Sequence, residues 1–392
     1  MTQRMRYGAV AAAALLGTAA AACAGPASGP PVPHGPRGGS ASAAAPARGF
    51  TLAASGDILP HESVIGRARA DADGDGHDFA PMLAAVEPVV SGADVAICHM
   101  ETVYGEEEGP FTGYPDFVSP PEVAQGLKDT GYDSCSTASN HALDDGSAGV
   151  RRTLDALDKA GVRHTGTARS AAEATRPALL TAGGARIAQL AYTYGVNDHP
   201  FPDGQPWAVA LVDEKKIVAD ARAARKAGAD VVVVSLHWGT EWQTAPDEIQ
   251  LDLGRRLTAS RTGTRPDIDL ILGTHAHVPQ AYEKVNGTWI IYGMGDQIAG
   301  VMTNDDGELD GRGNQGSIGR FTFAPPAAKG QRWPVRRAEF VPQLMDTGTG
   351  RVVNLREAVR ADPERDDYRE VLDDISATVL SRGAAADGLA LG

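Results

Sequence analysis

The 392-residue sequence is poor in cysteine, in aromatic residues and in basic charge. Its 3 cysteines are too few and too widely spaced for a structural zinc site of the cysteine type. Lys and Arg number 36 against 50 Asp and Glu, which gives a formal net charge of -14. An acidic chain without a basic cluster excludes nucleic acid as an expected partner. No segment after residue 22 is long and apolar enough to span a bilayer.

The first residues have the pattern of a secretory signal. Arg4 and Arg6 precede an apolar, alanine-rich run over residues 8–22, which is shorter than a membrane span. The run ends in three alanines before Cys23, which resembles a bacterial lipobox, although ordinary cleavage nearby is an alternative. We therefore expect residues 1–23 to be a lipoprotein signal peptide. A lipid on Cys23 would anchor the exported chain to the outer face of the cytoplasmic membrane.

Three further regions follow the signal. Residues 24–48 are mostly Gly, Pro, Ser and Ala, and such a segment cannot offset its ordering entropy, so it is expected to be a disordered tether. Residues 49–345 are long enough for one large domain. Residues 346–392 are charged and are expected to form a C-terminal peripheral segment, in part helical.

From residue 50 onward, short apolar runs alternate with amphipathic segments, which predicts an α/β domain. Apolar runs without polar alternation suit strands that are buried on both faces. The predicted strands are residues 50–55, 94–98, 132–137, 186–192, 231–236, 268–272, 288–292, 321–323 and 338–341. The predicted helices are residues 81–90, 121–130, 147–160, 213–227 and 247–259. A long loop over residues 103–119 is expected either to overhang a site or to be a solvated surface loop.

Cys98 and Cys135 fall late in two of the predicted strands. An exported compartment would allow a disulfide between them. Because both positions are expected to be buried, we predict two free thiols.

Side chains of the metal-ligand type stand at five predicted strand ends. They are Asp57, His99 or Glu101, Asn140 with His141, His237, and His275 with His277. In open α/β sheets, ligands bind at the carboxyl ends of the strands. A single strand-end Asp can cap a helix, and a lone His is more often a hydrogen-bonded structural residue. Five such ends in one chain favour a shared metal site.

The kinds of side chain at these strand ends limit which metals and which reactions are expected. Carboxylate, amide and imidazole without thiolate favour one or two divalent metal ions, from among Mn, Zn, Fe, Mg and Ca. Two metals bridged by a carboxylate would clamp an anionic group and lower the pKa of a bound water. That chemistry suits hydrolysis of a phosphate ester or an amide. His141 is next to Asn140 and could supply a proton to the leaving group.

Five segments together resemble the CapA family, also called the poly-γ-glutamate capsule synthesis or PgsA-like family. They are ASGD at 54–57, DVAICHMET at 94–102, ASNHALDDG at 138–146, HWGTE at 237–241 and GTHAH at 273–277. Two more segments, HDFAPM at 77–82 and IYGMGD at 291–296, extend the likeness over residues 50–300. The family looks like a branch of the calcineurin-like metallophosphatase superfamily. The resemblance therefore implies a metallophosphatase-like four-layer α/β/β/α sandwich.

The resemblance also implies roles for the strand-end residues. Asp57 and His277 would hold one metal, and Glu101 would stand where a bridging acid stands. The second metal would be held by Asn140, His237 and His275. His141 would match the acid that faces the substrate.

The sequence departs from the family pattern around Asp57. The histidine expected two residues after Asp57 is missing, since Leu59 occupies that position and His61 is displaced. His99 stands where the family has Asn, and it could bind metal or support a ligand from behind; we expect the support. Asp296 replaces another usual Asn. We therefore expect a well-formed second metal position and a less complete first one.

By resemblance, the chain is an extracytoplasmic protein implicated in the biosynthesis of poly-γ-glutamate or a related capsule or envelope polymer, beside polymer-synthase membrane subunits. One alternative is a metal-dependent phosphoesterase or amide hydrolase that acts on an anionic polymer or a small-molecule substrate. Another is a non-catalytic assembly subunit that retains the metal fold.

Overall fold

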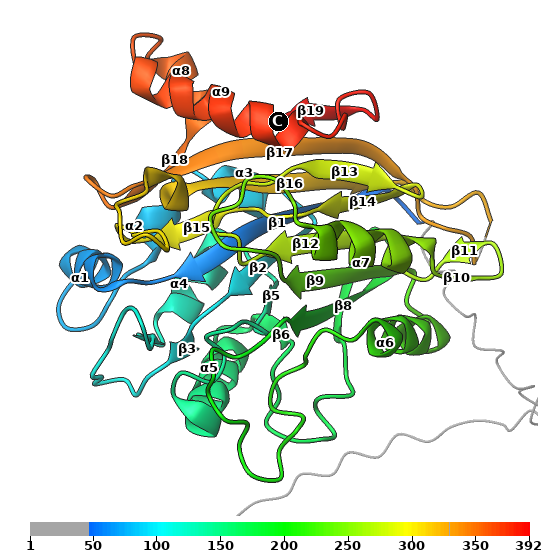
Figure 1. Cartoon of the computed structure of the whole chain (residues 1–392), viewed down its shortest axis with the longest axis horizontal. Coiled ribbons are helices and arrows are strands. Elements are labelled where there is room, and N and C mark those ends of the chain that lie inside the picture. Colours follow the sequence, from blue (N-terminus) through cyan, green and yellow to red (C-terminus); the bar gives the residue numbers. More distant parts are fainter. Residues whose placement is uncertain (1–46, 329) are drawn as a thin grey trace, which may run out of the picture. The chain divides into compact units, whose positions relative to one another are not determined.

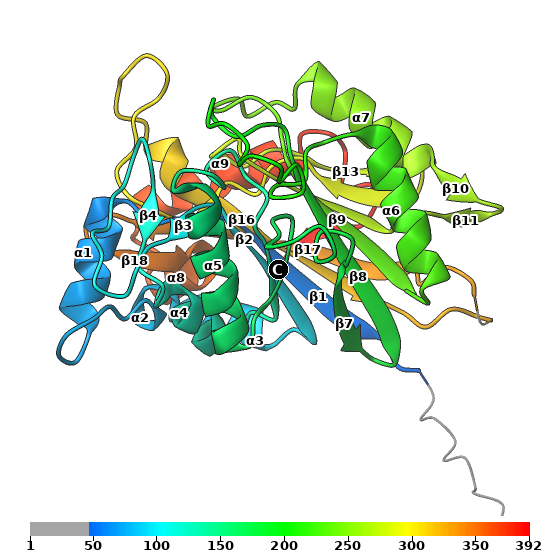
Figure 2. The same ribbon diagram turned by 90° about the horizontal axis from the view of Figure 1, so that it is seen from below.

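The computed structural model describes residues 47–328 and 330–392. The predicted signal peptide, Cys23 and almost all of the predicted tether lie outside the described residues. Within the described ranges, no helix has the length and apolar character needed to cross a membrane. Figures 1 and 2 show two mixed sheets with helices on their outer faces.

The first large sheet has the strand order β18-β17-β16-β1-β2-β5-β6, with β15 paired to β1 and β19 paired to β17. Its strands are β1 (Phe50–Leu59), β2 (Val95–Met100), β5 (Ser134–Ser136), β6 (Arg163–Thr165), β15 (Asp296–Ala299), β16 (Gln315–Phe323), β17 (Val335–Asp346), β18 (Arg351–Asn354) and β19 (Leu389–Leu391). β1 runs parallel to both β2 and β15. The carboxyl ends of these strands therefore meet at one edge of the sheet.

The second large sheet has the order β13-β14-β12-β9-β8-β7. Its strands are β7 (Ala178–Ala182), β8 (Ala185–Thr193), β9 (Val231–His237), β12 (Leu270–Thr274), β13 (Tyr282–Val285) and β14 (Thr288–Ile291). β9 begins with four consecutive valines, which suit a central strand buried on both faces. Two small ribbons pair β3 (Val103–Tyr104) with β4 (Val118–Ser119), and β10 (Arg261–Thr262) with β11 (Arg265–Pro266).

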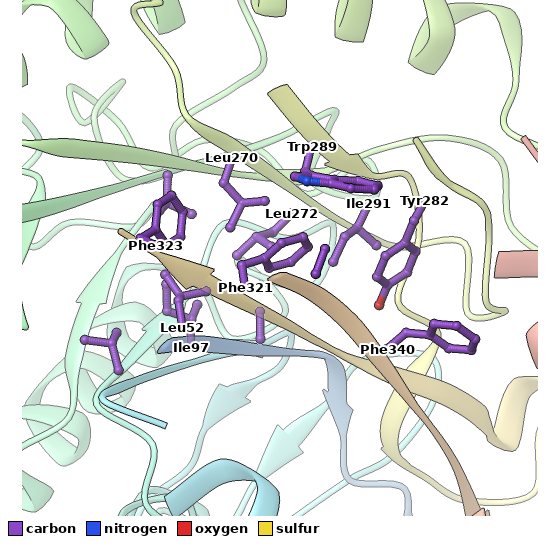
Figure 3. Packing of buried hydrophobic residues seen from close by; sticks show 14 of the residues in the cluster. Leu52, Ile97, Leu270, Leu272, Tyr282, Trp289, Ile291, Phe321, Phe323 and Phe340 are labelled. Carbon is purple, nitrogen blue, oxygen red and sulfur yellow. The ribbon is translucent and has the colours of Figure 1, made fainter. Parts of the chain in front are cut away.

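The two large sheets pack face to face through one hydrophobic core. Figure 3 shows Leu52 and Ile97 of the first sheet near Leu270 and Leu272 of the second. Helices cover the outer faces through two further cores. On the first sheet these are α1 (Glu62–Asp71), α2 (Ala80–Leu83), α3 (Glu87–Ser91), α4 (Val123–Thr130) and α5 (Gly146–Ala160); on the second they are α6 (Glu214–Lys226) and α7 (Glu248–Ala259). The four-layer α/β/β/α prediction is confirmed.

Local signals explain where several helices begin. Asp213 caps α6 by accepting a bond from Lys216 N, and Asp247 forms a capping box with Gln250 at the start of α7. The single helix predicted over residues 81–90 is wrong, because the structure has α2 and α3 instead. Pro88 lacks a backbone N–H and stands in the first turn of α3, so the chain starts a new helix there.

The C-terminal segment is part of the domain rather than peripheral. β17 crosses the boundary predicted at residue 345, and β19 pairs with β17. α8 (Leu355–Ala361) and α9 (Asp366–Leu380) follow β18, while the short 3-10 helix η1 (Gly311–Asn314) precedes β16. Leu355, Ile375 and Val379 join the core between the sheets. The expectation of helix in this segment is met by α8 and α9, but the sequence did not show that their apolar side chains reach the core.

Cys98 and Cys135 form a disulfide, so the prediction of two free thiols is wrong. The two cysteines lie opposite each other in neighbouring parallel strands, β2 and β5, with their Cα atoms 4.4 Å apart. Each strand could be predicted from its own apolar run, but the pairing of the two strands and its register could not.

Candidate metal centre

Strands of both sheets end at the same place. In the first sheet, Asp57 lies opposite both His99 and Asp296 in the strand register. In the second sheet, His237 ends β9 and His275 directly follows β12. His275 N donates a hydrogen bond of 3.1 Å to Asp57 Oδ2. This bond joins the carboxyl edges of the two sheets directly.

Gly56 makes the close approach of β1 and β15 possible. A Cβ atom at Gly56 would lie 1.7 Å from Gly295 O, just before Asp296, so only glycine fits. The β1 strand continues to residue 59, beyond the predicted end at residue 55, and its pairing shifts register beside Asp57. The shift places Asp57 inside the strand with its carboxylate in the cluster.

The His275–His277 segment has an unusual backbone. The φ angles are 94° for His275 and 58° for His277, which few residues other than glycine adopt. The turn brings the His275 ring to 4.7 Å from the ring of His237, centroid to centroid. It also brings His277 Nδ1 to 3.0 Å from Asp296 Oδ1. The strained turn therefore presents two imidazoles to one cluster.

On one side of the cluster, three side chains surround Asp57. Asp57 Oδ1 lies 3.7 Å from His99 Nε2, and Asp57 Oδ2 lies 4.0 Å from His277 Nδ1. Asp296 completes a group with Asp57 and His277 whose ligand atoms lie within 4.8 Å of one another. Asp57 thus has three neighbours of the metal-ligand type.

The other side of the cluster is built around His237. His237 Nε2 lies 2.8 Å from Asn140 Oδ1 and 3.6 Å from Glu101 Oε1. Glu101 Oε1 is also 4.0 Å from His277 Nε2, so Glu101 lies between the two sides. His275 Nδ1 points toward Glu241, with 3.8 Å between Nδ1 and Oε1.

The structure brings all six predicted ligand residues into this one buried cluster. They are Asp57, Glu101, Asn140, His237, His275 and His277, each at most 5% exposed. His141 lies beside them, also buried.

Many candidate ligand atoms in the cluster have no hydrogen-bond partner among residues 47–328 and 330–392. They are Asp57 Oδ1, His99 Nε2, both Glu101 carboxylate oxygens, His275 Nδ1 and Asp296 Oδ2. Buried polar atoms are normally paired, so a concentration of unpaired carboxylate and imidazole atoms is unusual. Oxygen and nitrogen ligands of this kind fit a divalent cation.

Burial and mutual repulsion work against ionised carboxylates in this cluster. Burial, and then the neighbouring Asp296, raise the pKa of Asp57. Burial, and then Asp57, raise the pKa of Glu101. Burial raises the pKa of Asp296 to about 6. The protein alone therefore disfavours the charged forms that bind metals.

The imidazoles divide into two kinds. Burial, and then repulsion from other imidazoles, lower the pKa of His237 and of His275, and lower the pKa of His99 to about 3. Burial also opposes the charge of His277, but Asp296 and Glu101 outweigh it and raise the pKa of His277. The neutral form of the first three is the form that can bind a metal.

Two residues of the cluster were not predicted as ligands. His99 was expected to support a ligand, yet its Nε2 atom faces Asp57 while Nδ1 lies 2.7 Å from Ser136 Oγ. Asp296 was noted only as a departure from the family pattern, although its place just after a strand and a glycine turn was a signal. His61 lies apart, with its Nδ1 atom 3.0 Å from both Leu59 O and Gly300 N.

His141 is held by a carboxylate. Its Nδ1 atom lies 2.6 Å from Asp144 Oδ2, which also accepts a bond from Phe117 N. The Phe117 ring stands edge-on to the His141 ring at 4.9 Å. Asn197 Nδ2 lies 3.4 Å from His141 Nε2. The loop over residues 103–119 therefore contacts the site, as the first of its two predicted roles requires.

Comparison with known proteins identifies relatives. The profile of the family described as "Bacterial capsule synthesis protein PGA_cap" matches residues 51–301. The PGA biosynthesis protein CapA of Bacillus subtilis is 28% identical over 208 residues, which are 52% of this chain and 53% of that protein. The capsule biosynthesis protein CapA of Bacillus anthracis is 26% identical over 180 residues, which are 45% and 42% of the two chains. The chain thus spans about half the length of these curated relatives.

Two solved structures with low sequence identity to this chain are also similar to it. The NAD nucleotidase of Haemophilus influenzae has a TM-score of 0.44 at 13% identity, over 88% of this chain and 57% of the other. The calcineurin-like phosphoesterase YfkN of Bacillus subtilis has a TM-score of 0.43 at 14% identity, over 84% of this chain and 100% of the other.

Proposed function

This chain belongs to the PGA_cap family of bacterial capsule synthesis proteins, and from that premise we propose that it is a metal-dependent hydrolase in capsule polymer biosynthesis. Its substrate would be poly-γ-glutamate, a related envelope polymer or an anionic precursor. The observation that carries the proposal is the buried cluster with its unpaired ligand atoms. Among the described residues, neither Lys nor Arg forms an ion pair with Asp57, Glu101 or Asp296.

We propose that one or two divalent ions bind in this cluster. Asp57, His99, His277 and Asp296 would hold the first, Asn140, His237 and His275 the second, and Glu101 would lie between them. When bound, such ions polarise the bond to be broken and make a water molecule more acidic. This assignment fits the ligand types, and it fits the lowered pKa of His99, His237 and His275, whose neutral rings can bind a metal.

The side chains of the protein would donate a proton to the leaving group and limit the access of water. Asp144 accepts at His141 Nδ1, which orients the ring and leaves Nε2 as the atom that gives a proton to the leaving group. The Tyr194 ring lies 4.4 Å from the His275 ring, and the Trp242 ring lies 6.2 Å from the His277 ring. These two aromatic side chains would limit water at the mouth of the site.

We also propose that the domain works outside the cytoplasmic membrane, next to the membrane subunits of a polymer synthase. The lipid on Cys23 would hold it there. Labelling with a radioactive fatty acid tests this: the full chain should carry label, and Cys23→Ala should lose both the label and membrane association. Label that persists in Cys23→Ala would contradict the anchor.

The activity can be tested with the full chain, loaded with Mn²⁺ or Zn²⁺ or stripped by a chelator. The loaded protein should hydrolyse a generic phosphodiester or a γ-glutamyl peptide, and the stripped protein should not. His141→Ala should bind metal normally but lose roughly 100-fold or more of the turnover. A metal-loaded protein without turnover on either substrate would favour the assembly subunit instead.

A further inference from the structure

We propose that Asp116, Asp144 and His199 form a second, outer cation site, distinct from the strand-end cluster, which takes a borderline divalent cation such as Zn²⁺ or Mn²⁺. One ligand atom from each residue, two carboxylate oxygens and one imidazole nitrogen, lies within 4.8 Å of the others. Two carboxylates and one imidazole are a common ligand set for these metals.

The distances from His199 show that one of the three candidate ligand atoms lies outside hydrogen-bond range. His199 Nε2 lies 3.0 Å from Asp116 Oδ1, which is hydrogen-bond distance. The same Nε2 atom is 3.6 Å from Asp144 Oδ1, which is too long for a hydrogen bond. An ion pair between His199 and Asp116 therefore accounts for only two of the three ligands.

Asp144 points to a ligand independently of this spacing. Its side chain is 0% exposed, yet within the described part of the chain its Oδ1 atom has no hydrogen-bond partner. The other oxygen, Oδ2, is occupied by His141 Nδ1 and Phe117 N. A buried carboxylate oxygen without a partner is costly. Oδ1 lies 3.6 Å from His199 Nε2, and the ligand atoms of Asp116, Asp144 and His199 lie within 4.8 Å of one another, so a cation between the three would remove that cost.

The three ligands come from separate segments around the mouth of the site. Asp116 belongs to the loop between β3 and β4, Asp144 lies between β5 and α5, and His199 follows β8. Figure 2 shows the β3–β4 ribbon beside α5. Asn197, two residues before His199, reaches His141 Nε2 at 3.4 Å. A cation would thus hold together the loops that position His141 and Asp144.

The outer site shares no residue with the strand-end cluster, so it does not depend on the hydrolase proposal. Bound Zn²⁺ should be counted by mass spectrometry in the metal-stripped full chain after Zn²⁺ is added back. The double variant Asp116→Asn/His199→Gln should bind one Zn²⁺ fewer per chain than the wild type. Asp198→Asn, which removes an exposed charge from the same loop, should bind as many as the wild type.

Further variants separate the two sites. His237→Ala disables the strand-end cluster, and it should still lose one Zn²⁺ when the two outer substitutions are added. Zn²⁺ should also slow proteolysis within residues 103–119 in the wild type, but not in the outer double variant. The proposal is overturned if the double variant binds as much Zn²⁺ as the wild type, or if Zn²⁺ protects this loop equally in both.

Discussion

Buried aspartates lie at both ends of the strands, but their partners differ. At the amino end, Asp269 is buried before β12 and forms ion pairs with Arg225 and Arg332, and it accepts a bond from Val232 N. At the carboxyl end, Asp57 and Glu101 are equally buried, and among the described residues their only ion-pair partners are imidazoles. These three acids are equally buried, but within the described ranges only Asp269, at the amino end, has Arg side chains as ion-pair partners.

The same kind of hydrogen bond, from a backbone N–H to an Asp side chain, recurs at the amino end. Asp94, Asp133 and Asp230 each accept a backbone N–H from a neighbouring strand, at Thr51, Ala96 and Arg186. These carboxylates tie neighbouring strands together through backbone hydrogen bonds. At the carboxyl end, Asp57 Oδ2 also accepts a backbone N–H, from His275, but within the described part of the chain Asp57 Oδ1 and both Glu101 carboxylate oxygens have no hydrogen-bond partner. These unpaired oxygens are why the acids there fit an external cation.

The largest effect should come from removing a ligand at the carboxyl end. Glu101→Gln takes away the carboxylate between the two sides of the cluster, so turnover should fall about 1000-fold. Asp230→Asn at the amino end should leave turnover within roughly 2-fold, because it alters only a strand contact. The measurement is kcat with the metal-loaded full chain. An equal loss of kcat in both variants would contradict the difference between the two ends of the strands.

A substitution at the amino end should reduce stability instead. Asp269→Ala leaves Arg225 and Arg332 without their buried partner, so the free energy of unfolding should drop by about 3–5 kcal/mol. Urea unfolding measures this loss, and kcat per folded molecule should stay near the wild-type value. A stable variant that has lost its metal would show that the two ends are not independent.

The disulfide tests how rigidly the carboxyl end is held. The double variant Cys98→Ser/Cys135→Ser opens a loop of 37 residues, and the free energy of unfolding should fall by about 3 kcal/mol. Because His99 directly follows Cys98, metal affinity should fall as well. Thermal unfolding and metal titration measure the two effects. Unchanged unfolding under reducing and oxidising conditions in the wild type would contradict a structural disulfide.

The smallest expected effect is a pH-dependent change in the free energy of unfolding. Burial raises the pKa of Asp296 to about 6, above its unfolded value of about 3.9, so the folded state binds this proton more tightly. In chelated protein, this stabilisation is lost as the pH rises from about 4 to about 6. Asp296→Asn cannot titrate, so its free energy of unfolding relative to wild type should rise by about 2 kcal/mol across that window.

Urea unfolding at a series of pH values checks this prediction. Saturating metal should reverse the order, since the asparagine then weakens binding. A difference between variant and wild type that does not change with pH in chelated protein would be inconsistent with a raised pKa.

Much of the fold could be predicted from local pattern. The valine run of β9 and the apolar stripe of α5 can each be recognised from a short stretch of sequence. The six candidate ligand residues could be predicted to share one cluster because each stands where an apolar strand ends, and parallel strands bring such ends together.

The rest depends on pairing across long stretches of sequence. Asp296 joins the site because β15 pairs with β1, and Cys98 meets Cys135 because β2 and β5 share a register. His99 could be placed on β2, but its contact with Asp57 follows from the register between β1 and β2. None of these contacts leaves a periodic signal, so a single sequence does not reveal them.

The most direct test of the metal centre is a crystal of the full chain grown with Mn²⁺, measured with anomalous scattering at the manganese edge. One or two anomalous peaks should lie within coordination distance of Glu101, Asp57 and His237. A well-ordered cluster without a peak, in a crystal soaked to saturation, would contradict the account.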